Sequence, residues 1–425
     1  MRRLLMTAAL AATAMFLFAG QAAASSSARF GIQDDAWLRW GPGTLDSRLD
    51  RLDSLGVKTV RFTLVWSEIA KQKPSSGTDP NDEAYDWSAF DPVMDGLHAR
   101  HITPLITLWG SPKWANGGKA PNALPTTTAF GAFAYAAAKH YPWVRMWTVW
   151  NEPNTRVFSV PVSPSMYVKN LLNPAYASLH RANRANMVAG GVTSPRRTAS
   201  GMSPTTFAEG MRAAHAHLDA YAANPYPGTK VETPFRDPCS FCKTLNMSRL
   251  PQIRALVTEL FGASKQLWLT EYGYQTDPPD RVLGVSYAKQ AQYIGQAALR
   301  VWEQPGATVL IQFLVQDEPS IGGWQSGLYT KAGKAKPARA AFALPLAQMS
   351  RSGTRTLLWG QVRPGSGARS YVIQRWSGGH WVNVGGTKRT GAAGTFRISV
   401  NVAAGTKVRL KSPEVAFASP AMVVT

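Results

Sequence analysis

The sequence predicts an α/β protein in which a (β/α)8 TIM barrel is followed by a small all-β sandwich. Two observations predict the barrel. Apolar strand-like runs alternate with amphipathic helical runs from about residue 29 to residue 345. Successive strand-like runs begin roughly 30 to 50 residues apart, which is the spacing of βα units. A third observation predicts the sandwich, because beyond residue 354 the apolar residues alternate with polar ones at the period of a strand.

The first residues have the pattern of a secretory signal peptide. Arg2 and Arg3 form a charged start, residues 4–18 form an apolar stretch, and small alanines precede a cleavage site expected after Ala24. The apolar stretch is too short to span a bilayer, so we expect an exported protein without a transmembrane anchor. The expected division is a signal peptide at 1–24, the barrel at 25–349, a linker at 350–354 and an accessory sandwich domain at 355–425.

Eight short apolar runs are the expected barrel strands, because each is rich in β-branched and aromatic residues. They are residues 30–34, 59–66, 103–109, 146–151, 187–193, 218–224, 267–272 and 308–315. Between these runs, apolar residues recur at the spacing of a helix. Leu45, Leu49 and Leu52 would lie on one helical face, and Gly56 is placed to end that helix. No glycine-rich phosphate-binding loop follows the first expected strand, and this argues against a dinucleotide-binding sheet.

The sandwich is expected to contain five to seven strands. Residues 371–376 and 397–402 alternate cleanly, and paired glycines at Gly378 and Gly385 mark turns between strands. Residues 355–425 hold ten basic residues and a single acid, Glu414. Such a basic module could bind an anionic cell-wall polymer, or it could cap the barrel.

The whole chain is basic, with 46 Lys and Arg against 25 Asp and Glu, and a formal net charge of +21. This charge favours acidic polysaccharide, anionic polymer or lipid headgroups as partners, or else reflects the composition of the source proteome. We expect no nucleic-acid partner, because no nucleic-acid-binding motif accompanies the charge.

The chain has only two cysteines, Cys239 and Cys242. A Cys-x-x-Cys pair without a second pair or a histidine cluster argues against zinc, and in an exported protein it favours a small local disulfide. We expect no metal and no other cofactor.

Two of the expected strands end on a glutamate. Glu152 follows the fourth strand in the segment Thr-Val-Trp-Asn-Glu-Pro-Asn, and Glu271 follows the seventh in Leu-Thr-Glu-Tyr-Gly-Tyr. Both would lie at the carboxyl-terminal face of the barrel, where barrels keep their active sites. Paired carboxyl groups are what glycosidic bond cleavage needs, one as acid and one as nucleophile.

These motifs, with the later segments 326–329 and 336–338, resemble glycoside hydrolase clan A over about three quarters of the chain. The resemblance is closest to families 5 and 39, the cellulase-like and xylosidase-like groups. It implies that Glu152 is the acid/base, that Glu271 is the nucleophile, and that Asn151 holds the sugar 2-hydroxyl. It also implies retention of anomeric configuration, with the two carboxyl groups about 5–5.5 Å apart.

The two glutamates need opposite environments. Glu152 must stay protonated near the working pH, and Glu271 must be ionised beside donors or cations. Arg61, among the apolar residues of the second strand, matches the clan's strand-two arginine, although it could instead point outward. Tyr226, after the sixth strand, resembles the tyrosine that donates to the nucleophile, although it could instead pack a loop.

Aromatic platforms for sugar rings are the remaining candidates. Trp109, Trp114, Trp150 and Trp324 could each present an apolar face to a sugar, or could pack in the core or a loop. Asp35 could bond a sugar hydroxyl. The chain departs from the family pattern in two places, which puts the substrate in doubt. Trp109 stands where many family-5 members have a histidine, and the eighth strand does not end on a tryptophan, for which Trp324 is the candidate replacement.

The sequence therefore predicts a secreted, monomeric retaining glycosidase that acts on an extracellular or cell-wall polysaccharide or oligosaccharide. Two alternatives remain open. The first is a non-catalytic carbohydrate-binding protein, which turnover of any glycan would exclude. The second is a transglycosylase that remodels a polymer with the same residues, which longer products would reveal.

Overall fold

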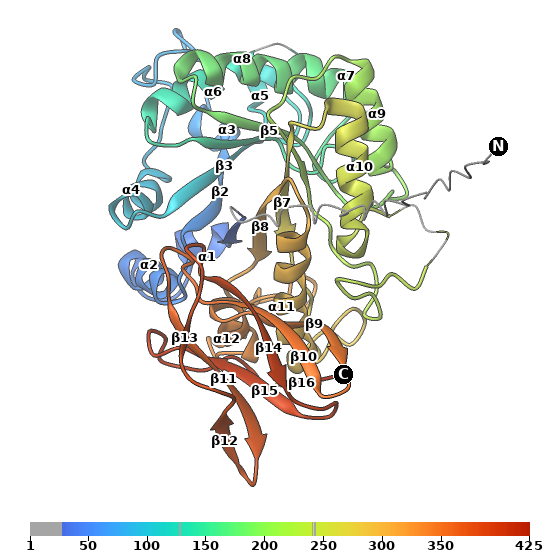
Figure 1. Ribbon diagram of the computed structural model, residues 1–425. Helices are drawn as coiled ribbons and strands as arrows, with labels where there is room; N and C mark the ends of the chain where they lie inside the picture. The colour runs from blue at the N-terminus through green and yellow to red at the C-terminus, as the bar shows by residue number, and fades with distance from the viewer. Residues whose placement is uncertain (1–27, 127–128, 240, 242–243) are drawn as a thin grey trace, which may run out of the picture.

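The computed structural model describes residues 28–126, 129–239, 241 and 244–425. Its larger part is a closed barrel in which eight parallel strands follow one another in chain order, which confirms the predicted barrel (Figure 1). The strands are β1 (Arg29–Gln33), β2 (Thr59–Val65), β3 (Thr103–Trp109), β4 (Met146–Val149), β5 (Met187–Thr193), β6 (Ala220–Ala223), β7 (Gln266–Tyr272) and β8 (Ala307–Phe313). The predicted signal peptide, residues 1–24, lies outside the described residues.

Five barrel strands, β1, β2, β4, β6 and β8, end one or two residues earlier than the sequence predicts. Strand β4 ends at Val149 because Trp150 turns the chain with a φ of 70°. Strand β8 ends at Phe313 because Leu314 has a φ of 129°. Strand β6 is limited to Ala220–Ala223. Positive φ angles break the ladder in a way that an apolar run of sequence does not reveal.

Helices cover the outside of the barrel between successive strands (Figure 1). The longer ones are α2 (Leu45–Ser54), α4 (Asp91–Ala99), α6 (Ala129–His140), α8 (Asn173–Ala182), α9 (Pro204–Ala213), α10 (Leu250–Phe261), α11 (Tyr287–Glu303) and α12 (Pro337–Ala343). Shorter elements are α1 (Asp35–Trp40), α3 (Trp66–Ile69), α5 (Lys113–Asn116), α7 (Pro164–Tyr167), η1 (Val168–Leu172) and η2 (Met247–Arg249).

Helix α2 illustrates how the sequence sets these elements. The Thr44 side chain accepts a hydrogen bond from the Ser47 N–H and begins the helix. Leu49 and Leu52 are fully buried, and Gly56, with a φ of +70°, lets the chain turn back toward β2. The described part of the chain has no helix that is both long and apolar enough to cross a membrane.

The C-terminal part contains eight strands in two antiparallel sheets, more than the five to seven expected. They are β9 (Leu346–Ser352), β10 (Arg355–Gln361), β11 (Ser370–Ser377), β12 (His380–Asn383), β13 (Lys388–Arg389), β14 (Thr395–Asn401), β15 (Lys407–Lys411) and β16 (Met422–Val423). One sheet has the order β14-β10-β9, and the other has the order β12-β11-β15-β16 with β13 beside β11. Apolar residues of both sheets, including Leu358 and Tyr371, pack in a common core.

The predicted linker at 350–354 requires correction. Residues 350–352 belong to β9, which pairs with β10 so that Ser352 lies opposite Arg355. Gly353, with a φ of 57°, makes the hairpin turn. The sandwich therefore begins at Leu346, directly after α12. The Ser-Arg-Ser-Gly-Thr sequence is polar because it forms an exposed hairpin, not because it separates two domains.

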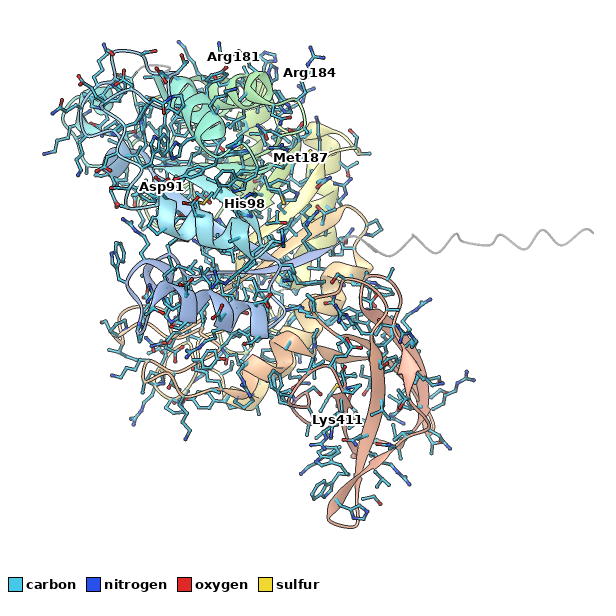
Figure 2. All side chains as sticks on the ribbon, turned by 90° about the vertical axis from the view of Figure 1, so that its left-hand side faces the viewer. Asp91, His98, Arg181, Arg184, Met187 and Lys411 are labelled. Atoms are coloured by element: carbon cyan, nitrogen blue, oxygen red, sulfur yellow. The ribbon has the colours of Figure 1, made fainter. Side chains whose placement is uncertain are left out.

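The sandwich packs firmly on the barrel. Trp359 of β10 is fully buried, and its ring centroid lies 6.0 Å from that of Trp302 in α11. The guanidinium of Arg363 lies 4.5 Å from the ring centroid of Phe30 and 4.3 Å from that of Phe342. Figure 2 shows the two parts from the side, with Lys411 marking the sandwich.

Candidate active site

A cavity of about 370 Å³ opens at the carboxyl-terminal ends of the barrel strands. Side chains from the ends of β1, β2, β3, β4, β7 and β8, and from the loop after β6, line it. Eight of the residues singled out from the sequence border it: Asp35, Arg61, Trp109, Asn151, Glu152, Tyr226, Glu271 and Trp324. Trp324, from the loop after β8, closes one side. The structure thus gathers in one place groups that lie up to 289 positions apart in the sequence.

The backbone around Glu152 is in an unusual conformation. Trp150 and Glu152 have φ angles of 70° and 36°, and residues other than glycine rarely adopt this backbone region. Hydrogen bonds hold both residues there, from Trp150 N–H to the Leu108 carbonyl (2.9 Å) and from Glu152 N–H to the Val192 carbonyl (3.0 Å). Such conformations cost on the order of 1–3 kcal/mol each and persist where the surroundings enforce them. Neighbouring strands thereby aim the Glu152 carboxyl group into the cavity.

The environment of Glu152 favours its protonated form. Burial, and next the charge of Glu271, raise the pKa of Glu152 to about 8. A hydrogen bond from the Asn224 amide (3.1 Å) and the charges of Arg61 and Arg196 act in the opposite direction. At neutral pH this carboxyl group therefore holds a proton that it can donate.

Glu271 is held by hydrogen-bond donors on both carboxylate oxygens. One carboxylate oxygen accepts a hydrogen bond from the Arg61 guanidinium in an ion pair, and the other accepts one from the Tyr226 hydroxyl (3.0 Å). Burial raises the pKa of Tyr226 well above its ordinary value, so its hydroxyl remains a donor. Both carboxylate oxygens of Glu271 are therefore engaged, one by a cation and the other by a neutral hydroxyl.

Arg61 is the centre of the polar network beneath the cavity. Only 1% exposed, it donates to Thr107 Oγ1 (2.8 Å), Gln33 Oε1 (2.7 Å) and Asn151 Oδ1 (2.9 Å) as well as to Glu271. The bond to Asn151 fixes that amide, so its nitrogen is the end available to donate to a ligand. A rigid fork of donors suits Arg61 to this task, since a lysine could not reach all four partners.

The four predicted aromatic platforms divide into two pairs. Trp109 and Trp324 line the cavity, and the Trp324 ring lies 4.7 Å from that of Tyr226. Trp114 does not line it; its ring packs edge-on against Trp66 and its Nε1–H donates to the Ala70 carbonyl. Trp150 is fully buried. For Trp114 and Trp150 the predicted platform role is therefore corrected to core packing.

The two aspartates after β1 also differ in their roles. Asp35 borders the cavity and accepts hydrogen bonds from Thr63 N–H and the Gln33 amide, both at 3.3 Å. Asp34 uses its oxygens within the fold, accepting from Trp37 N–H in α1 and from Val315 and Gln316 N–H after β8. Asp34 thus ties the first and last strands together, and Asp35 is the one left for a ligand.

Several site residues were not singled out from the sequence. Asn224, which bonds Glu152, and Gln33, which bonds Arg61, both lie at strand ends on the cavity face. Their positions at the ends of the strand-like runs 30–34 and 218–224 were a signal that could have identified them. Arg196, in the loop after β5, carries no such signal because it belongs to no regular element.

A buried ion pair holds the loop that carries Trp324. The Lys336 ammonium donates to Asp317 Oδ1 (2.7 Å), Thr276 Oγ1 (2.8 Å) and the Gln325 carbonyl (3.1 Å), and both charged side chains are almost fully buried. Lys336, singled out earlier only as part of a family-like tail segment, fixes the chain next to Trp324.

Replacing Lys336 by Met should destabilise the protein by about 3–5 kcal/mol, because Asp317 would remain buried without its cation. Urea unfolding followed by tryptophan fluorescence measures the loss. The double variant Lys336→Met/Asp317→Leu should recover much of it, since no unpaired charge remains. A double variant as unstable as the single one would contradict this account.

The cysteine loop follows β6. Arg249 anchors it, through an ion pair with Asp237 (3.1 Å) and a hydrogen bond to the Cys239 carbonyl (2.5 Å). Cys242 lies outside the described residues, so the bond between Cys239 and Cys242 stays a prediction.

Comparison with known proteins reveals the same architecture in solved glycosidase structures. A GH39 enzyme from Xanthomonas axonopodis pv. citri superposes with a TM-score of 0.57 at 17% identity, covering 92% of this chain and 94% of that one. A monomeric beta-xylosidase from Caulobacter crescentus CB15 gives 0.59 at 16% identity, covering 92% and 97%. At these identities the likeness shows the fold.

Sequence comparison adds little to this. No family model matches the chain. A segment of 73 residues is 40% identical to Myrosinase 2 of Arabidopsis thaliana, which is 16% of this chain and 13% of that protein. The chain therefore matches only a small part of this curated relative.

Proposed function

We propose that the protein is a retaining glycoside hydrolase. The observation that carries this proposal is the pairing of two glutamates in one cavity with opposite electrostatic environments. Glu152 is partly buried in surroundings that raise its pKa to about 8, and Glu271 is held by a guanidinium and a phenol. One carboxyl group with a raised pKa beside a second that is paired with a cation is the arrangement that glycosidic bond cleavage requires.

In the proposed mechanism, the Glu271 carboxylate attacks the anomeric carbon while Glu152 gives its proton to the departing oxygen. The covalent glycosyl–Glu271 ester is then hydrolysed by a water molecule whose proton returns to Glu152, which restores both groups. In this mechanism the Asn151 amide holds the sugar hydroxyl next to the anomeric carbon. Retention and the 5–5.5 Å carboxyl separation stay predictions from the family resemblance.

The proposed substrate is an extracellular or cell-wall polysaccharide or oligosaccharide, met after export. The signal-like sequence of residues 1–24 supports export, and the basic sandwich supports an accessory role on anionic wall material. The beta-xylosidase and GH39 names of the structural neighbours support a β-linked sugar.

The test is release of new reducing ends from a panel of plant, bacterial-wall and exopolysaccharide glycans, compared with Glu152→Gln and Glu271→Gln. Proton NMR of the first-formed anomer reports retention or inversion. Activity that both variants lose supports the proposal, and longer products would identify a transglycosylase instead. Glycan binding by a folded protein without turnover across the panel would favour a carbohydrate-binding protein.

The pH dependence of turnover should respond to Asn224. Its hydrogen bond to Glu152 favours the ionised form and so lowers the pKa of Glu152. Replacing Asn224 by Leu removes that bond and raises this pKa, so the acid form persists to higher pH. The alkaline limb of the kcat/KM profile, expected near pH 8 in the wild type, should therefore move to higher pH.

Thr270→Val is the matched control for this shift. The Thr270 hydroxyl donates to Asn224 Oδ1 (2.8 Å) and makes no hydrogen bond to Glu152. The alkaline limb of this variant should stay near that of the wild type. An alkaline limb that moves to lower pH in Asn224→Leu would contradict the assignment of Glu152 as the acid.

A further inference from the structure

A second cavity, of about 240 Å³, continues the cleft beyond Glu152. Glu152 borders both cavities, whereas Glu271 and Arg61 border only the first. In the proposed reaction Glu271 attacks the sugar ring and Glu152 protonates the oxygen that leaves it. The attacked ring therefore lies in the first cavity, and the leaving group extends into the second, here named the leaving-group cavity.

The leaving-group cavity is formed by the loops that follow β5, β6, β7 and β8. Its lining includes Ser194, Arg196, Thr198, Tyr226, Gln275 and Trp324. Arg196 is the only cationic side chain among the described residues that line it, and Glu152 is the only acid. Because Glu152 is held protonated, the net charge presented to a ligand is positive.

Arg196 is positioned with most of its donors unused. One guanidinium nitrogen donates to the Tyr226 carbonyl (3.0 Å), and the group rests on Gly228, where a Cβ would come within 2.7 Å of the guanidinium carbon. No carboxylate forms an ion pair with it anywhere in the described chain. A guanidinium has five N–H donors, so several remain for a ligand.

Besides Glu152, the acids whose charges act on Arg196 are Glu232 and Asp237, and both bind other partners. Glu232 accepts hydrogen bonds from Gly228 N–H (3.0 Å) and the Asn246 amide (2.7 Å). Asp237 pairs with Arg249 at 3.1 Å. The half-buried charge of Arg196 is thus left without a direct partner at the wall of the leaving-group cavity.

We propose that Arg196 selects a leaving group that carries a carboxylate, as a uronic acid residue does. This inference rests on the proposed glycosidase function and names the substrate class of the same site. A guanidinium binds a carboxylate through two parallel hydrogen bonds, and such charge-assisted bonds are roughly twice as strong as neutral ones. One cation in the cavity matches one singly charged sugar.

The test compares two aryl glycosides of the sugar released in the glycan panel, one with a 4-carboxyphenyl and one with a 4-carbamoylphenyl leaving group. The two differ in charge and little in shape. The ratio of their kcat/KM values should fall about ten- to hundred-fold from wild type to Arg196→Gln. Intrinsic reactivity cancels, because the same pair is used for every variant.

Arg197→Gln is the matched control, since Arg197 is the exposed neighbour outside the cavity lining. This variant should keep the wild-type ratio. If Arg196→Gln also keeps it, the proposal is overturned. If Arg196→Gln slows both substrates equally, Arg196 only supports the Tyr226 loop, which also overturns the proposal.

A binding measurement separates this inference from the glycosidase proposal. The free leaving groups, 4-hydroxybenzoate and 4-hydroxybenzamide, are titrated while tryptophan fluorescence is followed, because Trp324 borders the cavity. Tighter binding of the benzoate, lost in Arg196→Gln and kept in Arg197→Gln, supports the anion site even if no glycoside is hydrolysed. Equal binding of the two probes to the wild type counts against it.

Discussion

Replacing Glu152 by Ala is expected to slow hydrolysis of glycosides with a sugar leaving group by about 10²–10⁴-fold, the usual contribution of a general acid. The loss should be much smaller for a 2,4-dinitrophenyl glycoside, because that leaving group departs without a proton. Replacing Glu271 by Gln should abolish turnover of both substrates, since no nucleophile remains. Steady-state kinetics of the two variants on the two substrates measure this contrast.

Added azide provides the control for Glu152→Ala. A small anion in the space left by the carboxyl group can attack the glycosyl–enzyme ester, so azide should restore turnover of the dinitrophenyl substrate. It should do nothing for Glu271→Gln. Equal losses on both substrates in Glu152→Ala would show that Glu152 is not the acid.

Arg61→Met should reduce both stability and turnover. It leaves Glu271 buried without its cation, a change that typically costs about 3–5 kcal/mol of unfolding free energy. With Tyr226 as the remaining donor to the carboxylate, kcat should fall by about 10²–10³-fold, the usual effect of losing one preorganised electrostatic partner. Denaturant unfolding and steady-state kinetics check the two effects separately.

Arg61→Lys is the informative partner of this variant. It keeps the positive charge but cannot bond Thr107, Gln33 and Asn151 at once. We expect its stability to lie between those of wild type and Arg61→Met. A Met variant with wild-type stability and turnover would remove Arg61 from the proposed machinery.

The barrel could be predicted because its signals are local and repeated. Each strand is an apolar run of a few residues, and strand ends in a closed parallel barrel must meet at one face. That geometry alone brings Glu152 and Glu271 to the same cavity. The contacts of Arg61 and Tyr226 with Glu271 follow from the same strand-end logic.

The parts that the sequence could not reveal depend on side-chain direction and loop conformation. Trp114 and Trp109 are five positions apart, yet only Trp109 reaches the cavity. Trp150 is turned into the core by its own positive φ, which no pattern of residue types encodes. Arg196 and Trp324 lie in loops whose paths are set by buried contacts such as that between Lys336 and Asp317.

The boundary between barrel and sandwich has a consequence for how this chain can be divided. Gly295 of α11 lies so close to Leu346 of β9 that a Cβ would come within 2.4 Å of its carbonyl oxygen, and Trp359 completes the apolar core around Trp302. The sandwich therefore cannot be exchanged for another domain without changing the barrel. Cutting the chain near residue 345 would expose apolar surface of the barrel. Its role on glycans is best dissected with charge-reversing substitutions on the exposed β-strands, and a graft of this barrel onto another binding module would have to carry β9 and β10 with it.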